Sequence, residues 1–97
     1  MPAVARKGDA DAPHCSPMKR EGASPNVFAN GIAISRQGDA NTLHKIPKGK
    51  GCGDHQAPIT TGSTTVFING KGCGRIGDAI TGCTKVAAGS SNVFAGG

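Results

Sequence analysis

The chain has 97 residues and a formal net charge of +5, and its only aromatic side chains are three Phe. Leu, Ile, Val and Phe together supply about a sixth of the residues, which excludes a large apolar core, and no apolar run is long enough for a membrane-spanning helix. The charge is too moderate for a disordered chain, so we expect one small, turn-rich β domain over residues 1–97, stabilised by something besides apolar burial.

The first seven residues lack the apolar segment of a signal peptide, so we expect a protein that is made and folded in a bacterial cytoplasm. The chain contains four cysteines: Cys15, Cys52, Cys73 and Cys83. Because that compartment is reducing, the sequence favours free thiols or metal ligands over disulfides.

Two short patterns each occur three times along the chain. Arg-x-Gly-Asp-Ala stands at residues 6–10, 36–40 and 75–79. A small polar turn that leads into a Val-Phe strand stands at residues 22–28, 62–67 and 89–94. Such turn residues followed by β-branched and aromatic residues are typical of short strands, so the repeats predict three similar β units.

Each unit has the same predicted internal order. In the first two Val-Phe copies, the Arg of the other pattern follows the Val by nine residues, and Asn30-Gly31 or Asn69-Gly70 lies between them. Asn-Gly is typical of hairpin turns because both residues tolerate positive φ. We therefore expect a Val-Phe strand, an Asn-Gly turn, a second strand and a Gly-Asp turn. The Asp of that last turn is expected to accept hydrogen bonds from nearby backbone amides rather than to act as a general base.

A side chain that can bind a metal stands five residues after the Asp of each Gly-Asp turn: His14, His44 and Cys83. These equivalent positions converge if the units are arranged about a pseudo-threefold axis, and the remaining histidine, His55, would complete a tetrahedral set. Three neutral imidazoles and one thiolate suit one Zn²⁺ per chain, with Fe²⁺ as the alternative. The ion would join all three units, so its binding energy would appear as folding energy.

The other cysteines have competing interpretations. Cys15 directly follows His14 and could be the ligand in its place. Cys52 and Cys73 each lie in a Gly-Lys-Gly-Cys-Gly stretch, which does not fit the phosphate-binding pattern G-x-x-x-x-G-K-[ST]. Each is better interpreted as a tight turn with a small buried thiol.

These motifs resemble the PAAR-repeat family, whose members cap the spikes of type VI secretion systems and of contractile-tailed bacteriophages. Residues 2–6, Pro-Ala-Val-Ala-Arg, are similar to the Pro-Ala-Ala-Arg signature with one residue inserted, and the repeats recur in family order over the whole chain. The resemblance implies an all-β fold: a small pseudo-threefold cone of short strands with the metal near its apex. The family's three His and one Cys would correspond to His14, His44, His55 and Cys83.

The resemblance also implies a partner, because the broad base of such a cone docks, one copy per trimer, on a homotrimeric β-helical spike (a phage central spike or a VgrG-like protein). A trimeric β-helix ends in three unpaired strand edges, with which three similar strands of one chain can pair. The candidates for this base are Val27, Phe28, Val66, Phe67, Val93 and Phe94. They are equally candidates for the small core, because alternate side chains of a strand face opposite ways.

The implied function is mechanical: the protein would cap and sharpen the spike and help to pierce the target cell envelope, with no catalysis, small-molecule substrate or nucleic acid. It would be located at the spike tip of a phage tail baseplate or be secreted on a type VI spike, in a stand-alone form without an effector extension. Two alternatives are a small zinc-binding enzyme and a basic nucleic-acid-binding module. A closed four-ligand set argues against the enzyme, and scattered lysines without aromatic stacking platforms argue against the module.

Overall fold

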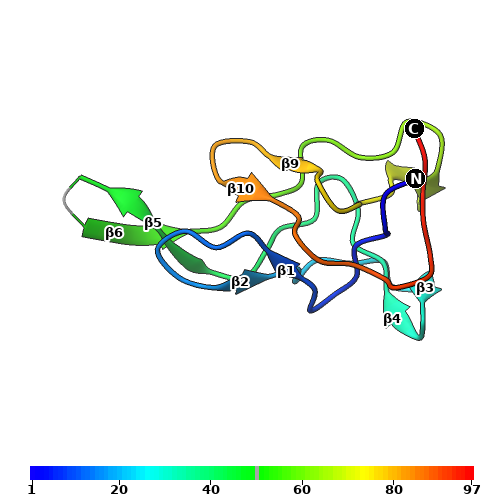
Figure 1. Ribbon diagram of the computed structural model, residues 1–97, viewed down its shortest axis with the longest axis horizontal. Coiled ribbons are helices and arrows are strands. Elements are labelled where there is room, and N and C mark those ends of the chain that lie inside the picture. Colours follow the sequence, from blue (N-terminus) through cyan, green and yellow to red (C-terminus); the bar gives the residue numbers. More distant parts are fainter. Residues whose placement is uncertain (50) are drawn as a thin grey trace.

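The computed structural model describes residues 1–49 and 51–97, and this part of the chain is all-β, without a helix (Figure 1). Its ten short strands form five antiparallel two-stranded ribbons within the described residues. The ribbons are β1 (Ala10–Asp11) with β2 (Met18–Lys19), β3 (Phe28–Ala29) with β4 (Ile32–Ala33), β5 (His44–Lys48) with β6 (Gly51–His55), β7 (Phe67–Ile68) with β8 (Lys71–Gly72), and β9 (Ala79–Ile80) with β10 (Thr84–Lys85). In this part of the chain, nothing has the length and apolarity of a membrane-crossing helix.

The two predicted Asn-Gly turns close the hairpins β3–β4 and β7–β8. The φ angles are 57° at Asn30, 76° at Gly31, 55° at Asn69 and 78° at Gly70. Both central residues of each turn are therefore in the left-handed region, which matches the right-handed twist of the flanking strands. The predicted hairpin positions are confirmed.

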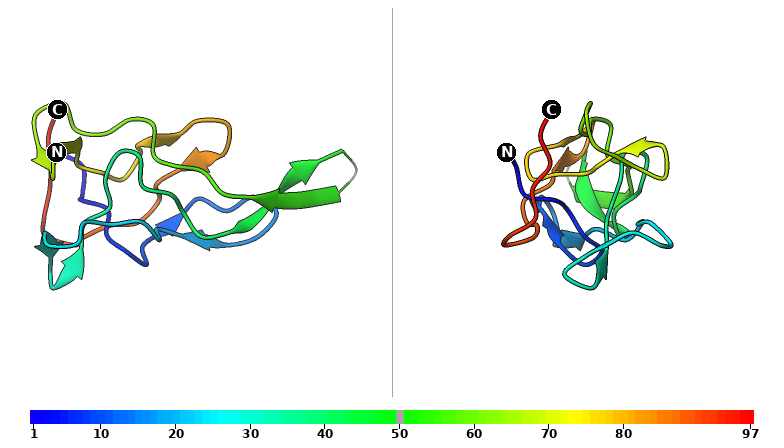
Figure 2. Two further views of the ribbon diagram at one scale, coloured as in Figure 1. Left: turned by 180° about the vertical axis from the view of Figure 1, so that it is seen from behind. Right: turned by 90° about the vertical axis from the view of Figure 1, so that its right-hand side faces the viewer.

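The third unit is completed by the two ends of the chain. Ala3 forms an antiparallel bridge with Phe94, and the N–H of Val4 donates to the carbonyl of Val93 at 2.9 Å. The last Val-Phe strand thus pairs with the N-terminal segment, which leads directly into the first Arg-x-Gly-Asp-Ala copy. Both termini consequently lie at the broad end of the molecule, as Figure 2 shows from two further sides.

Three backbone hydrogen bonds form a closed ring that relates the units to one another. Ser35 N–H donates to the carbonyl of Ala5, Gly74 N–H to that of Ser35, and Ala5 N–H to that of Gly74, each at 2.9 Å. Each of these residues directly precedes the Arg of one Arg-x-Gly-Asp-Ala copy. Equivalent sequence positions are therefore equivalent in space, and the predicted pseudo-threefold arrangement is confirmed.

The aspartate of each Gly-Asp turn binds the arginine three residues before it. Asp9, Asp39 and Asp78 accept the backbone N–H of that arginine at 2.8, 2.8 and 2.7 Å, respectively. The guanidinium of the same arginine forms an ion pair with the same carboxylate, and these bonds raise the arginine pKa in all three turns. The predicted turn-stabilising role of the aspartates is confirmed.

The apolar core is small, as the composition predicts, and it consists of two clusters. One cluster lies towards the broad end: Val4, Ala29, Ile34, Ile68, Cys73 and Ala95, with Val27 and Val93 packed against it. A second cluster consists of Ala5, Ala57, Ile59, Ile80 and Val86, with Cys83 packed against it. The molecule measures 40 × 23 × 21 Å, and the β5–β6 hairpin extends beyond both clusters to form its narrow end (Figure 1).

The expectation of free cysteines is wrong for one pair, because Cys15 and Cys52 form a disulfide. Cys52 lies opposite Pro47 in the β5–β6 hairpin. The Cα atoms of Cys15 and Cys52 are 6.2 Å apart, which is within the range that a disulfide allows. Cys52 is also exposed and lies within strand β6, not in a tight turn with a buried thiol. Cys73 is a buried free thiol, as predicted, although it lies in a β-bridge with Arg36.

Candidate metal centre

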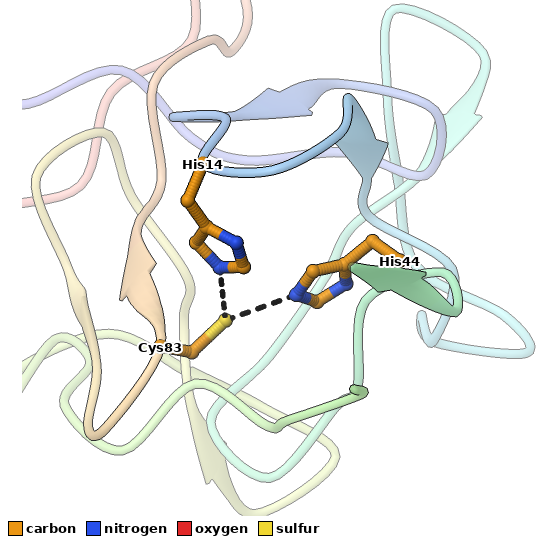
Figure 3. Close-up of side chains that lie close together, drawn as sticks. All are labelled: His14, His44 and Cys83. Carbon is orange, nitrogen blue, oxygen red and sulfur yellow. Dashed lines mark hydrogen bonds between the residues drawn. The ribbon is translucent and has the colours of Figure 1, made fainter. Parts of the chain in front are cut away.

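Three of the four predicted ligands meet where the body of the cone joins the protruding hairpin. His14 lies in the loop between β1 and β2, His44 begins β5, and Cys83 lies in the turn between β9 and β10. Their ligand atoms all lie within 4.8 Å of one another. Figure 3 shows both imidazoles directed at the sulfur atom.

The distances suit a tetrahedral ion. The Nε2 atoms of His14 and His44 lie 3.3 and 3.2 Å from Cys83 Sγ. A tetrahedral zinc ion holds nitrogen and sulfur ligands roughly 3.5 Å apart, given its usual bond lengths to these atoms. Only small movements would therefore bring each nitrogen–sulfur pair to the separation that such an ion requires.

The protonation of both imidazoles also suits metal binding. Nδ1–H of His14 donates to the carbonyl of Lys45 at 2.5 Å, and Nδ1–H of His44 donates to that of Thr42 at 2.7 Å. A carbonyl oxygen can only accept a hydrogen bond, so the proton of each neutral ring is on Nδ1. This leaves the Nε2 lone pairs facing Cys83, an arrangement typical of histidine ligands that are oriented by a second hydrogen bond.

His55 stands beside this cluster rather than inside it. It pairs with His44 across the β5–β6 hairpin, and its ring centroid lies 5.2 Å from that of His44 and 6.3 Å from that of His14. Its Nε2 atom is buried and has no hydrogen-bond partner among the described residues. A buried polar atom without a partner is costly, so the structure leaves this nitrogen available for a ligand.

A buried polar network beneath the ligands was missed by the sequence analysis. Asn41 Nδ2 donates to Asp11 Oδ2 at 3.2 Å and lies 3.9 Å from Cys83 Sγ. Arg20 Nε lies 3.3 Å from Asp11 Oδ1, and both of these side chains are fully buried. The repeats carried a signal for this network, since Asp11 and Asn41 occupy equivalent positions, each three residues before a predicted histidine ligand.

Burial controls the electrostatics of this region. It raises the pKa of the Cys83 thiol, an effect that the hydrogen bond from Asn41 opposes. Burial likewise raises the pKa of Asp11 and lowers that of Arg20, and the attraction between the two charges opposes both shifts. Since the thiolate is the form that binds a metal, an ion has to displace a proton from Cys83. The disulfide leaves Cys15 without a free thiol, so in this structure it is not a rival of His14 as a ligand.

The predicted base residues divide between two environments at the broad end. Phe28, Phe67 and Phe94 are 56%, 59% and 51% exposed, respectively. Val27 and Val93 pack against the apolar cluster of the base, whereas Val66 is 37% exposed. The phenylalanines therefore face outwards at three equivalent positions, while two of the three valines contribute to the core.

Comparison with known families agrees with this arrangement. The model of the PAAR motif matches residues 49–97, half of the chain, a segment that contains the third Arg-x-Gly-Asp-Ala copy and Cys83. No curated protein matches the chain. Given the threefold repeat, the all-β cone and the His-Cys cluster near its point, the match shows that this chain belongs to the PAAR-repeat family.

Proposed function

We propose that this protein is the spike tip of a contractile injection machine. It caps and sharpens a homotrimeric β-helical spike, with one copy per trimer, and helps to pierce the target cell envelope when the machine contracts. It acts at the tip of a phage tail baseplate spike or of a type VI spike with a VgrG-like trimer, and it performs no catalysis. The observation that carries the proposal is the set of three equivalent, outward-facing phenylalanines at the broad end.

These phenylalanines suit a threefold partner. Phe28 and Phe67 begin the hairpins β3–β4 and β7–β8, and Phe94 occupies the equivalent position where the chain ends meet. All three are more than half exposed, although burying a large aromatic side chain is favourable. Side chains related by a pseudo-threefold axis can each make the same contact with one subunit of a trimer. We therefore assign the docking surface to the three phenylalanines together with Val27, Val66 and Val93.

The narrow end has too little interior to be stabilised by apolar burial, and a metal ion suits it for that reason. We assign the ligands to His14, His44, His55 and Cys83, with Zn²⁺ as the ion and Fe²⁺ as the alternative. The orphaned Nε2 of His55 supports its inclusion. When bound, the ion would cross-link the loop between β1 and β2, the base of the β5–β6 hairpin and the turn that precedes β10.

The docking surface can be tested with the β-helical end of the cognate spike trimer. Native mass spectrometry of the mixture is expected to show one copy of this chain per trimer. The combined substitutions Phe28→Ser, Phe67→Ser and Phe94→Ser should abolish the complex, because they remove the exposed aromatic surface from every unit. The proposal is wrong if this variant, shown to be folded by its thermal transition, still binds the trimer as the wild type does.

A matched control is available in Leu43, which is 64% exposed and lies beside the candidate metal centre rather than at the base. Leu43→Ser removes a comparable exposed apolar side chain at the other end of the cone. It should leave binding to the trimer unchanged, so that a loss with the triple variant is attributable to the base.

A further inference from the structure

The disulfide joins two of the segments that form the candidate metal centre, although neither of its cysteines is a proposed ligand. Cys15 directly follows His14, and Cys52 precedes His55 by three residues on strand β6. The bond therefore joins the two chain segments that carry these two histidines. One segment is the loop of residues 12–17, and the other is the β5–β6 hairpin.

Apart from the disulfide, two hydrogen bonds attach this loop to the described residues of the hairpin, and both involve the backbone of a single residue. Lys45 N–H donates to Ser16 Oγ at 2.8 Å, and the carbonyl of Lys45 accepts the hydrogen bond from His14 Nδ1. The loop also contains Pro13 and Pro17, which have no backbone N–H to donate. Among the described residues, hydrogen bonding of the His14 loop to the hairpin is therefore limited to Lys45, whereas Ala12 at the start of the loop bonds to β10.

We propose that the Cys15–Cys52 disulfide is a positioning cross-link for the metal centre. It holds the loop that carries His14 against the hairpin that carries His55, so that the oxidised protein retains its ion and the reduced protein releases it faster. The inference rests on the proposed ligand set. Its physical basis is that a cross-link removes conformations from the metal-free state, so that binding the ion requires less ordering of the ligands.

A second consequence concerns the choice of ligand. In the reduced protein, the Cys15 thiolate stands next to His14 and competes with it for the ion, because soft thiolate ligands bind zinc well. Formation of the disulfide consumes this sulfur. The oxidised state thereby restricts the centre to one thiolate, that of Cys83, since Cys73 is buried in the base cluster.

The redox step is an ordinary thiol–disulfide exchange. The thiols of Cys15 and Cys52 transfer two electrons and two protons to a small-molecule disulfide such as oxidised glutathione, which leaves as two thiols. A dithiol reductant reverses the step. Cys52 is exposed and Cys15 is partly exposed, so both reagents can reach the bond.

The test measures the rate at which Zn²⁺ passes from the loaded protein to a chromophoric chelator. We expect oxidised wild type to release Zn²⁺ slowly, and the Cys15→Ser/Cys52→Ser variant to release it about 10- to 100-fold faster, the usual cost of losing a group that orients metal ligands. Reduced wild type should also release Zn²⁺ faster than the oxidised protein, and it should recover slow release on re-oxidation by oxidised glutathione. The release rate of the variant should not change with either reagent. A general loss of stability would not explain why only the wild type responds to reduction and re-oxidation.

Two controls separate the possible failures. Cys73→Val removes a thiol from the base cluster and should release Zn²⁺ at the wild-type rate in the oxidised state. With Co²⁺ in place of Zn²⁺, thiolate-to-metal absorption should correspond to one sulfur ligand in the oxidised protein and increase on reduction. Equal release rates in oxidised wild type and the double-serine variant would show that the disulfide does not position the ligands, without contradicting the proposed metal centre. If oxidised wild type binds no Zn²⁺ at all, the ligand set is wrong and the cross-link role falls with it.

Discussion

The broad base and the narrow point of this protein are built from the same repeats but stabilised differently. At the base, equivalent positions keep similar chemistry, with Phe28, Phe67 and Phe94 all exposed. Towards the point, equivalent positions differ, because Cys83 in the third unit stands where the other two units have His14 and His44. A symmetric surface needs three similar side chains, whereas one ion needs several ligands arranged around it. The three units thus share one backbone arrangement, whereas the side chains at equivalent positions are similar at the base and different near the candidate metal centre.

Three buried serines show how closely the base follows its pseudo-symmetry: Ser24, Ser63 and Ser90. The hydroxyl oxygen of each serine accepts hydrogen bonds from the backbone N–H groups of the residues two and three positions after it. Two of the three donate to the side chain of Asn69 or Asn30 in a neighbouring hairpin, and the third donates to the carbonyl of Gly96. The third unit is formed by the paired chain ends and has no Asn-Gly turn, so the carbonyl oxygen of Gly96 takes the place of the asparagine.

Removing a ligand at the point should produce the largest effect. Cys83→Ala is expected to abolish stoichiometric Zn²⁺ binding and to cost on the order of several kcal/mol, because the binding energy of a structural ion is part of the folding energy. Elemental analysis and thermal unfolding measure both. Amide hydrogen exchange should increase at residues 10–19 and 79–85 but not in the β3–β4 hairpin. If this variant keeps its ion, or if amide exchange increases equally at the base, the claim that the two ends are stabilised differently is wrong.

Breaking one Gly-Asp turn should have the next largest effect, and it should leave the metal centre loaded. Asp78 is almost fully buried and accepts hydrogen bonds from the backbone and guanidinium of Arg75 and from Thr61 Oγ1. Asp78→Ala should lower the free energy of unfolding by about 2–4 kcal/mol, because the arginine loses its partner in a largely buried site.

Urea unfolding measures this loss, and an exposed ion pair provides its control. Lys45 and Asp54 pair across the tip hairpin with side chains that are 51% and 64% exposed. Asp54→Ala should leave the unfolding midpoint essentially unchanged, because water screens such pairs. Equal losses in the two variants would show that the turn aspartates have no special role in the fold.

Local repetition explains what could be predicted from the sequence. The Asn-Gly hairpins, the Gly-Asp turns and the convergence of His14, His44 and Cys83 all follow from spacings within a unit, copied through the chain. The Cys15–Cys52 disulfide depends instead on the position of the long β5–β6 hairpin relative to a loop 37 residues away in sequence. The expectation of free thiols was based on the reducing conditions of the cytoplasm, and it contained no information about this geometry.

Two further features escaped prediction for related reasons. Closure of the third unit depends on the two chain ends meeting, and no pattern within a single repeat contains that information. The buried Asp11–Arg20 pair was also missed, because Arg20 lies between two repeats and has no equivalent in the pattern. Non-local pairings of single residues are therefore the part of this fold that periodicity does not encode.

A smaller effect is expected where the repeats and the structure disagree. Ala5 and Ser35 are equivalent to Gly74 in the backbone ring, so comparison of the repeats alone suggests that Gly74→Ala is harmless. The structure places a new Cβ there only 2.6 Å from the carbonyl oxygen of Ser35. Gly74→Ala should therefore cost about 1–3 kcal/mol in urea unfolding through overpacking of the ring. Gly51→Ala, whose Cβ would meet open space, is the matched control, and similar losses in both variants would contradict the argument.

At neutral pH, the smallest effect is expected from exchanging a base cysteine for its repeat equivalent. Cys73 occupies the position of Val4 and Ile34 in the other units, and Cys73→Val should change the free energy of unfolding by less than about 1 kcal/mol at pH 7. The two proteins should separate in alkali. Burial raises the pKa of the Cys73 thiol to about 11, whereas an unfolded thiol ionises near pH 8.5.

The direction of this pH effect follows from which state loses its proton first. Between about pH 8.5 and 11 the unfolded chain is the more ionised state, so each rise in pH favours unfolding of the wild type. Cys73→Val removes this contribution and should be the more stable protein by about 1–2 kcal/mol at pH 10. Urea unfolding of both proteins at pH 7 and pH 10 measures the difference. An equal alkaline loss in the two would place its origin in other groups, Cys83 at the point being the first candidate because burial raises the pKa of that thiol as well.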